Sequence, residues 1–262
     1  MSHAPAREER SSLPEPVLEV MYRLCVQRPL EGALLRAGFR EILELPTSPV
    51  RDSLLGSVLT GLVARGPTAE EVVAMLRALQ DIDALPGAPN EPVDLDRRVV
   101  VVHGSGKKGV KTINISTPSC LLAAAVGACV AKVGSRATSS LTGSYEFLKG
   151  AGVNVDIDTD DGIHMLEETG FGYFNTEAQA PNFFGCYKGL FHAPHALMFG
   201  SSPMFSPIRG DAVLYGIAHP DVGLSARVLC ELGFREARIY SSTADGIHHI
   251  DEIGRASCRE RV

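Results

Sequence analysis

The residues of this chain that could do chemistry gather in one segment, HGSGKKGVKTINIST, which covers residues 103–117. Three glycines and three lysines lie within it: Gly104, Gly106, Gly109, Lys107, Lys108 and Lys111. Glycine permits positive φ angles and lets a ligand approach the backbone closely. Several lysines in one loop attract negative charge. The segment therefore predicts a binding site for a polyanion such as a phosphate chain.

The sequence on either side predicts the elements that would position this loop. Val99–Val102 is a short β-branched run, which is typical of a buried strand. After the loop, Thr117 can cap a helix whose first position is Pro118 and which continues through the apolar run Cys120–Val126. A strand, a glycine loop and a helix N-terminus bind phosphate because free N–H groups and the positive helix end converge on one point.

A glycine-rich loop alone is weak evidence, because a plain turn has the same composition. The segment is not a Walker A loop, since Val110 separates Gly109 from Lys111-Thr112. It is not a Gly-x-Gly-x-x-Gly loop either, because residues 112–115 lie between the glycines and the predicted helix. The segment alone is therefore compatible with a plain turn and with a phosphate-binding loop.

A second segment, Lys132–Ser144 (KVGSRATSSLTGS), decides between them. It resembles the second signature of the anthranilate phosphoribosyltransferase family. Residues 104–117 match the first signature of that family, GTGGDG-x-x-TFNIST, at the same spacing. The resemblance extends over residues 48–252 and is strong in 103–147. It implies a Mg²⁺-dependent glycosyltransferase of the tryptophan-biosynthesis type, which moves phosphoribose from phosphoribosyl pyrophosphate to an aromatic or nitrogen acceptor similar to anthranilate.

The resemblance also implies roles for individual residues, although it names no catalytic residue. The residues implied to bind phosphoribosyl pyrophosphate are Gly104, Ser105, Gly106, Lys107, Lys108, Thr112, Asn114, Ile115, Ser116, Thr117, Lys132, Arg136, Ser139, Ser140 and Ser144. Gly104 and Ser135 are implied to contact the acceptor. Mg²⁺ is implied at Ser116 and at the late acidic pair Asp251-Glu252, because this ion prefers hard oxygen ligands.

Several positions depart from the family pattern. Lys107-Lys108 replaces the Gly-Asp of the first signature, and Val133 stands where the second signature has histidine. Ser135 replaces the asparagine that contacts anthranilate, and the family's Pro-x-Arg segment has no clear counterpart in Pro181–Leu190. We therefore expect a retained donor half of the site and an altered acceptor half.

Two other functions remain open on these residues. A nucleoside phosphorylase of the related fold would also carry glycines and a Lys-Thr pair, as in Lys111-Thr112. The run Asn114–Thr117 favours the phosphoribosyltransferase over this alternative. A non-catalytic relative that binds phosphoribosyl pyrophosphate is the third possibility, and the altered acceptor residues motivate it.

The N-terminal third predicts helices. Residues 1–12 are polar and charged and are expected to be a disordered leader. Helical patterns in residues 16–26, 48–65 and 68–79 predict a small all-helical unit over residues 13–83. Ser48 followed by proline predicts a helix start, Gly66 predicts its end, and Thr68–Glu71 is a capping box. The unit resembles the helical domain of the family, in which paired helices form a dimer interface, so we expect a homodimer. A plain helical subdomain is the alternative.

The Pro- and Gly-rich residues 84–97 predict a hinge, and residues 98–252 predict an α/β phosphoribosyl-binding domain. Alternating strand and helix patterns indicate a mixed or parallel sheet flanked by helices. After the first strand, further strands are expected at Ala128–Val133, Phe171–Phe174, Asp211–Ile217 and Ala237–Tyr240. Ser144 is expected to cap a short helix over Tyr145–Lys149.

Two segments do not follow this pattern. Residues 175–207 crowd aromatic, Gly, Pro and His residues without periodicity, which fits a binding segment or simple packing. Residues 253–262 match the translation of a common sequencing adapter, so we expect a non-native tail on a C-terminally truncated domain. A genuine basic tail is the alternative.

Composition restricts the class further. The chain has 262 residues, 45% of them hydrophobic, and a formal net charge of −6, which argues against general nucleic-acid binding. No apolar run approaches the roughly 20 residues of a membrane span, and the polar N-terminus is no signal peptide. The six cysteines form no Cys-x-x-Cys pair, so reduced thiols and a cytoplasmic location are expected.

Overall fold

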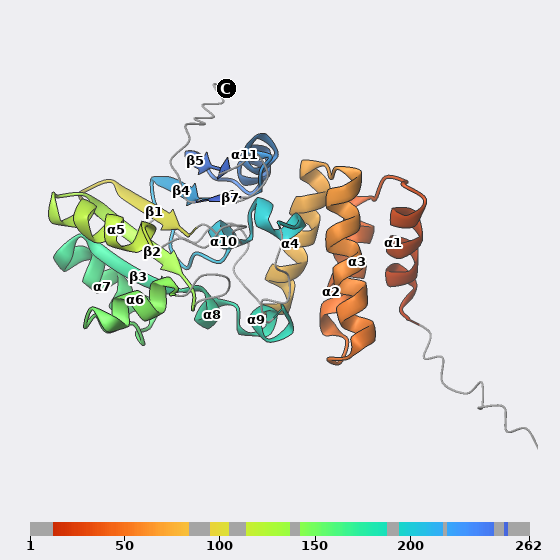
Figure 1. Cartoon of the computed structure of the whole chain (residues 1–262), viewed down its shortest axis with the longest axis horizontal. Helices are drawn as coiled ribbons and strands as arrows, with labels where there is room; N and C mark the ends of the chain where they lie inside the picture. Colours follow the sequence, from red (N-terminus) through yellow and green to blue (C-terminus); the bar gives the residue numbers. More distant parts are fainter. Residues whose placement is uncertain are drawn as a thin grey trace, which may run out of the picture.

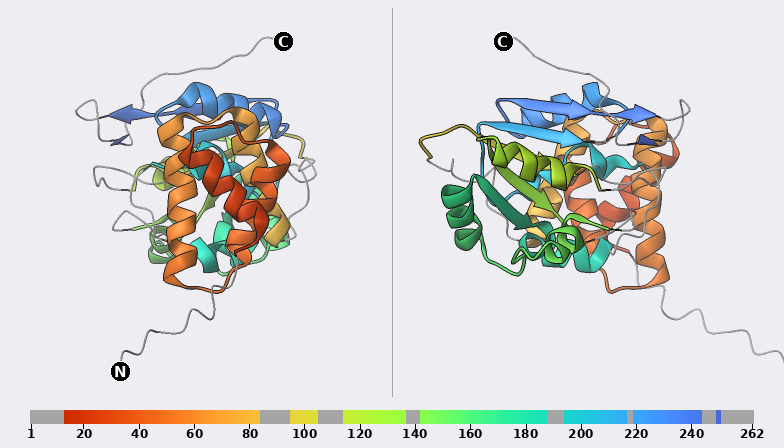
Figure 2. Two further views of the ribbon diagram at one scale, coloured as in Figure 1. Left: turned by 90° about the vertical axis from the view of Figure 1, so that its right-hand side faces the viewer. Right: turned by 60° about the vertical axis from the view of Figure 1, so that its left-hand side comes forward.

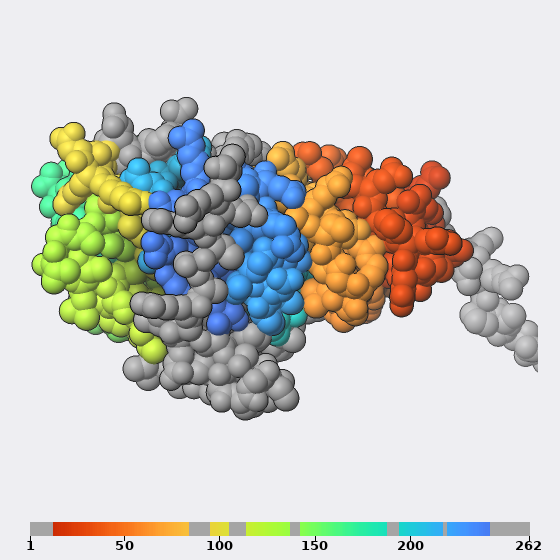
Figure 3. Space-filling model, turned by 90° about the horizontal axis from the view of Figure 1, so that it is seen from above, coloured from red at the N-terminus to blue at the C-terminus, as the bar shows by residue number. Residues whose placement is uncertain are grey.

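The structure is a computed structural model that describes residues 13–83, 95–104, 114–136, 142–187, 194–216, 219–243 and 249–250. The expected leader, the expected tail and most of the expected hinge lie outside these residues. Helices form one end of the molecule and an α/β part forms the other (Figure 1). Seen from above, the helical end is continuous with the α/β part (Figure 3).

Four helices make up the helical end. They are α1 (Glu15–Cys25), α2 (Gly32–Glu44), α3 (Pro49–Arg65) and α4 (Ala69–Asp83). The predicted start of α3 is confirmed, because the Arg51 amide donates to Ser48 Oγ at 3.2 Å. Gly66 follows its last residue with φ of +84°. The predicted capping box is confirmed too, since Glu71 N donates to Thr68 Oγ1 at 3.2 Å and Thr68 N to Glu71 Oε2 at 3.0 Å.

The α/β part is built on a five-stranded sheet in the order β3-β2-β1-β4-β5. Its strands are β1 (Val99–His103), β2 (Cys129–Gly134), β3 (Phe171–Asn175), β4 (Ala212–Gly216) and β5 (Ala237–Tyr240). All four neighbouring pairs are parallel, which confirms the expected fold class. A small antiparallel pair, β6 (Ser242–Thr243) and β7 (His249–Ile250), follows.

Helices cover both faces of this sheet (Figures 1 and 2). Those nearest to it are α5 (Ser116–Ala125), α6 (Ser144–Gly150), α7 (Thr159–Thr169) and α11 (Val222–Glu231). The apolar residues of α5 and α6 pack with Val130 and Tyr173 on one face. On the other face, Val101 and Val213 belong to a larger core that includes α11 and the helical end. Among the helices described, none is both long and apolar enough to cross a membrane.

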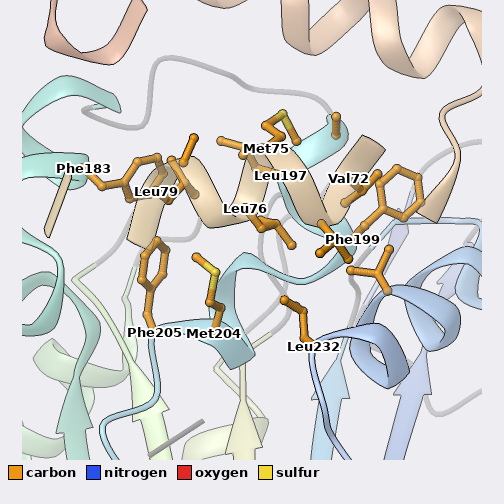
Figure 4. Packing of buried hydrophobic residues seen from close by; sticks show 14 of the residues in the cluster. Val72, Met75, Leu76, Leu79, Phe183, Leu197, Phe199, Met204, Phe205 and Leu232 are labelled. Carbon is orange, nitrogen blue, oxygen red and sulfur yellow. The ribbon is translucent and has the colours of Figure 1, made fainter. Parts of the chain in front are cut away.

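The aromatic segment after β3 contains short helices in its described residues, 175–187 and 194–207. It forms α8 (Thr176–Gln179), α9 (Pro181–Tyr187), the 3₁₀ helix η1 (Ala196–Phe199) and α10 (Ser201–Met204). Figure 4 shows Met204 and Phe205 on the side of α4 that faces the sheet, and Phe199 near Val72. Because these side chains are buried in the larger core, they join the helical end to the α/β part.

Two predicted helix caps are wrong. Helix α5 begins at Ser116, so Thr117 is its second residue and not its cap. The physical reason is Asn114, whose Oδ1 accepts the Thr117 amide at 3.3 Å and starts the helix earlier. Ser144 is likewise the first residue of α6, after Gly143, whose amide donates to Glu146 Oε2 at 2.8 Å.

Candidate functional site

The fold itself indicates where a ligand would bind. The chain runs from β1 outward through β2 to β3 and then returns to β4 on the other side of β1. In open parallel sheets, ligands bind outside the carboxyl ends of the strands at such a switch point. Gly104, the first residue after β1, lies at this point, and the strand arrows point toward the helical end (Figures 1 and 2).

Lys132 is the most unusual charge near this point. It lies in β2 with an exposed fraction of 0%, and its Nζ donates to the carbonyl oxygens of Val133 at 3.0 Å and Val102 at 3.4 Å. Among the described residues it has no ion pair with a carboxylate. Burial lowers the pKa of its ammonium group. A buried cation without a counter-ion is costly, so the position favours a bound anion.

The lysine points toward the glycine loop. A Cβ placed on Gly104 would lie 3.8 Å from Lys132 Nζ. Gly104 therefore brings the backbone close to the ammonium group, at the start of the segment that the sequence marks as an anion-binding loop. The rest of that loop, residues 105–113, lies outside the described residues.

The start of α5 is fixed to the start of α6 by hydrogen bonds. Asn114 Nδ2 donates to the Gly143 carbonyl at 3.0 Å, and Thr117 Oγ1 donates to Ser144 Oγ at 3.1 Å. Thr117 and Ser144 are both buried, so their hydroxyls join the two segments. Ser116, one position earlier on α5, is half-buried. The N-terminus of α5 is thus held in place, and a helix N-terminus is the kind of element that can bind an anion.

Gly134 at the end of β2 has no room for a side chain. A Cβ there would lie 2.6 Å from Ser144 Oγ and 2.8 Å from Ser144 Cβ. The Gly134 carbonyl accepts from Tyr173 Oη and from Thr176 Oγ1, both at 3.3 Å. The second signature therefore turns away from the sheet at a fixed point, directly behind Lys132.

Arg136 is held by partners that the sequence did not indicate. Its guanidinium lies 3.9 Å from the centre of the Tyr145 ring, and its Nε is 3.5 Å from Glu177 Oε2. Its amide also donates to Glu177 Oε1 at 3.2 Å. Ser135 donates its hydroxyl to the Arg136 carbonyl at 3.0 Å. The arginine is about half exposed, so it remains accessible at the edge of the site.

His103 is a further polar residue of this region that the sequence did not single out. It ends β1, immediately before Gly104, and is 1% exposed. Its Nδ1 lies 3.1 Å from Ser202 Oγ, and its ring meets Tyr215 edge-on at 6.2 Å. Burial, and secondarily the charge of Lys132, holds the pKa of His103 well below its ordinary value. A histidine ending an otherwise all-valine strand was the signal available.

The structure thus brings part of the predicted donor site together. Gly104 meets Lys132, while Asn114 and Thr117 meet the start of α6 at Gly143 and Ser144. Ile115 is 42% exposed beside them. The predicted residues outside the described ranges are Ser105, Gly106, Lys107, Lys108, Thr112, Ser139, Ser140, Asp251 and Glu252.

Of the three predicted metal ligands, the described residues include one. In the described part of the chain, no group of three or more His, Cys, Asp or Glu residues could hold a metal ion. The predicted acidic pair Asp251-Glu252 lies outside that part. The half-buried Ser116 hydroxyl, at the first position of α5, is the predicted metal ligand that the structure describes.

The fold defines a doubly wound α/β protein with a candidate anion site at the switch point of its sheet. Comparison with known proteins gives the family. The sequence model described as "Glycosyl transferase family, a/b domain" matches residues 96–261, and the chain belongs to this family.

Known relatives agree with this assignment. The chain is 31% identical to an anthranilate phosphoribosyltransferase of Nitrosospira multiformis, over 90% of this chain and 65% of the relative. It is also 31% identical to one of Stenotrophomonas maltophilia, over 82% of this chain and 60% of the relative. The chain thus spans less than two thirds of the length of these curated relatives.

Solved structures resemble the fold over similar ranges. An anthranilate phosphoribosyltransferase from Thermus thermophilus is 27% identical with a TM-score of 0.64, covering 84% of this chain and 65% of that one. The enzyme from Saccharomyces cerevisiae in complex with PRPP and Mg matches in fold with a TM-score of 0.70. It is 16% identical and covers 89% of this chain and 67% of that one.

Proposed function

We propose that this chain carries the donor-binding half of a phosphoribosyltransferase. The reaction would move phosphoribose from phosphoribosyl pyrophosphate to an aromatic or nitrogen acceptor of the anthranilate type. The observation that carries this proposal is Lys132, a fully buried ammonium group beside Gly104 that has no described carboxylate partner. The 31% identity to anthranilate phosphoribosyltransferases supports the choice of donor.

The residues would act mainly by binding and by placing charge. As the bond to pyrophosphate breaks, negative charge grows on the leaving group. Lys132 and the N-terminus of α5 would stabilise that charge, because fixed donors in a buried site need no reorganisation. The buried Thr117–Ser144 hydrogen bond would keep the two binding segments at a constant separation, which orients the ribose for attack.

Mg²⁺ is the expected companion of the donor. The Saccharomyces cerevisiae relative was solved with PRPP and Mg. In this chain Ser116 would offer a hydroxyl oxygen, and Asp251 with Glu252 would offer carboxylates. The ion would neutralise charge on the pyrophosphate. A hydroxyl at the first turn of α5 fits a metal that is bound together with phosphate.

The acceptor half would differ from that of the relatives. The Ser135 hydroxyl is engaged with the Arg136 carbonyl, and its backbone accepts the Tyr145 amide at 3.4 Å. A serine in this arrangement offers less to a ligand than the asparagine of the family signature. We therefore place the acceptor in the anthranilate class without requiring anthranilate itself. The relatives that the chain resembles are anthranilate phosphoribosyltransferases, which supports transfer over the phosphorylase and the non-catalytic alternative.

We further propose a homodimer formed through the helical end. Helix α1, the residue that follows it and the start of α3 expose large apolar side chains: Leu18, Tyr22, Val26 and Val50. Large exposed apolar side chains that gather on one part of a folded protein are candidates for an interaction surface. The expected domain limits, 13–83 and 98–252, remain our proposal as well. The described cysteines are all free, which agrees with the proposed cytoplasmic location.

Titration calorimetry with phosphoribosyl pyrophosphate, with and without Mg²⁺, tests the donor assignment. We expect binding that strengthens when Mg²⁺ is present. Release of pyrophosphate on addition of anthranilate or another aromatic amine would then establish transfer. Absence of metal-dependent binding would exclude the proposal. Binding without pyrophosphate release from any aromatic amine or acid would favour the non-catalytic relative.

A further inference from the structure

Arg136 is a half-exposed cation whose orientation is fixed on two sides. Its guanidinium carbon lies 3.9 Å from the centre of the Tyr145 ring, and its Nε lies 3.5 Å from Glu177 Oε2. Among the described residues, its two terminal nitrogens have no hydrogen-bond partner. A guanidinium presents its donors as a planar fork that fits a phosphate or a carboxylate. The side chain is thus oriented while most of its donors remain unused.

The aromatic ring that the guanidinium covers is itself held in place. Tyr145 is 4% exposed and belongs to the smaller core that α5 and α6 form with the sheet. Its hydroxyl donates to Asp156 Oδ1 at 2.7 Å. This hydrogen bond holds the pKa of the Asp156 carboxyl below its ordinary value, so the acceptor stays ionised at neutral pH. Because the face of an aromatic ring attracts a cation placed over it, the ring gives Arg136 a fixed surface.

Glu177 holds the same arginine by its main chain and by its side chain. Its Oε1 accepts the Arg136 amide at 3.2 Å, while its Oε2 is the oxygen that faces Arg136 Nε. Glu177 lies in the first turn of α8, whose start is fixed because Asn175 Oδ1 accepts the Glu177 amide at 3.0 Å. One carboxylate therefore fixes both the backbone of Arg136 after β2 and the direction of its guanidinium.

These three residues lie at the edge of the sheet where the donor is expected. Arg136 and Glu177 each come two residues after the end of a strand, β2 and β3, and these strands are parallel neighbours. Figure 1 shows α6 and α8 beside the ends of these strands. Arg136 follows the buried Lys132 by four residues, and a chain of that length spans at most roughly 14 Å. A ligand that carries phosphate groups at two ends of a sugar can therefore reach both cations.

We propose that Tyr145 and Glu177 are positioning residues for the donor, because they hold the Arg136 guanidinium in place to bind a phosphate group of phosphoribosyl pyrophosphate. The proposal rests on the proposed phosphoribosyl transfer, and it adds two residues that lie outside both signatures. The physical reason is preorganisation. An arginine that is already fixed loses less conformational entropy when its ligand binds, so the affinity for the ligand is higher.

Titration calorimetry of the full chain with phosphoribosyl pyrophosphate and Mg²⁺ tests this role. Tyr145→Leu removes the aromatic face, and Glu177→Ala removes the carboxylate. We expect each substitution to raise the Kd for the donor about tenfold, as for one weakened charge-assisted hydrogen bond. The matched control is Glu44→Ala on α2, where the carboxylate is 47% exposed and pairs with Arg40 at 3.0 Å. This control should leave the Kd unchanged.

Two conservative variants separate positioning from folding. Tyr145→Phe keeps the ring under Arg136 and should bind the donor much as the wild type does, although it loses the hydrogen bond to Asp156. Glu177→Gln keeps an oxygen for the Arg136 amide but carries no charge, so its Kd should lie between those of the wild type and Glu177→Ala. If Tyr145→Leu does not fold, the Glu177 variants still give the comparison, because that carboxylate is 28% exposed.

A double-mutant cycle gives a readout that a structural role would not move. Arg136→Ala alone should raise the Kd about 10- to 150-fold. Without the arginine, Tyr145→Leu and Glu177→Ala should each change the Kd by less than about twofold, because they act through it. Equal losses with and without Arg136 would overturn this inference alone, as would a wild-type Kd in both single variants. Failure of the wild type to bind phosphoribosyl pyrophosphate with Mg²⁺ would instead overturn the proposed function, and the inference with it.

Discussion

Replacing Lys132 with methionine tests how the buried charge is used. The side chain is 0% exposed, and among the described residues its Nζ donates to two backbone carbonyls. A charge-assisted hydrogen bond to phosphate contributes roughly 1.5–3 kcal/mol. The Kd for phosphoribosyl pyrophosphate should therefore rise about 10- to 150-fold in Lys132→Met.

The same substitution should stabilise the ligand-free protein. Methionine has a similar length and removes a desolvated ammonium group, and replacing such a charge by an apolar side chain is often stabilising by roughly 1–3 kcal/mol. In a protein of this size that corresponds to about 2–4 °C in melting temperature for each kcal/mol. Thermal unfolding without ligand measures the stabilisation. Titration calorimetry with the donor measures the loss of affinity.

The matched control is Lys149→Met, which removes the same charge from α6. Lys149 is 58% exposed and pairs with Asp156 at 3.2 Å, so its removal should change the stability little. It should leave donor affinity unchanged. If Lys132→Met lowers the melting temperature and binds the donor as the wild type does, the lysine is a structural residue and our reasoning is refuted.

The pH dependence of stability follows from the same residue. Burial lowers the pKa of Lys132 in the folded state, while the unfolded chain keeps the ordinary lysine value near 10.4. Between these two values the unfolded state binds more protons, so the free energy of unfolding rises with pH. The stability advantage of Lys132→Met should therefore shrink as pH approaches about 10. Urea unfolding from pH 7 to 10 measures this, and a constant difference would contradict it.

Two further predictions concern packing. Gly134→Ala should destabilise the protein by about 1–3 kcal/mol, because a Cβ there lies 2.6 Å from Ser144 Oγ. Gly150→Ala, where a Cβ meets nothing within 4 Å, should not, and equal melting temperatures for both would contradict the geometry. Phe199→Ala should lose about 3–5 kcal/mol in urea unfolding, because this ring is 1% exposed between the helical end and the sheet. Leu122→Ala, 70% exposed on α5, serves as its control, and a similar loss there would argue against a shared core.

Much of the fold was predictable from local patterns. The all-valine run became β1, and the Ser48-Pro49 start and the Gly66 end of α3 were both found where expected. These signals are local and depend on backbone chemistry alone. Helix α2 carried no such signal, since Glu31 at its start makes no side-chain cap.

The misplaced caps show what a one-dimensional pattern misses. Thr117 and Ser144 have the side chains of helix caps, yet their hydroxyls bond to each other across 27 residues of sequence. Asn114 starts α5 instead. Side-chain to backbone capping competes with contacts that exist only in the folded chain. The hydrogen bond between Thr117 and Ser144 keeps both hydroxyls from capping a helix, and sequence spacing could not reveal that bond.

The candidate site divides in a similar way. Motif spacing identified Gly104 and Lys132, which the structure brings together. It did not identify Glu177, which pairs with Arg136 from a segment of the chain without periodicity. Nor did it identify His103, because one histidine after four valines is unremarkable until its burial and its unpaired nitrogen are known. Burial and pairing are properties of the folded chain.

A crystal structure of this chain with phosphoribosyl pyrophosphate and Mg²⁺ tests the central claim most directly. We expect the pyrophosphate within hydrogen-bonding distance of Lys132 Nζ and of the first amides of α5, with the ribose at the carboxyl end of β1. Density for the donor elsewhere on the protein, with Lys132 still bonded only to the carbonyls of Val102 and Val133, would contradict the account.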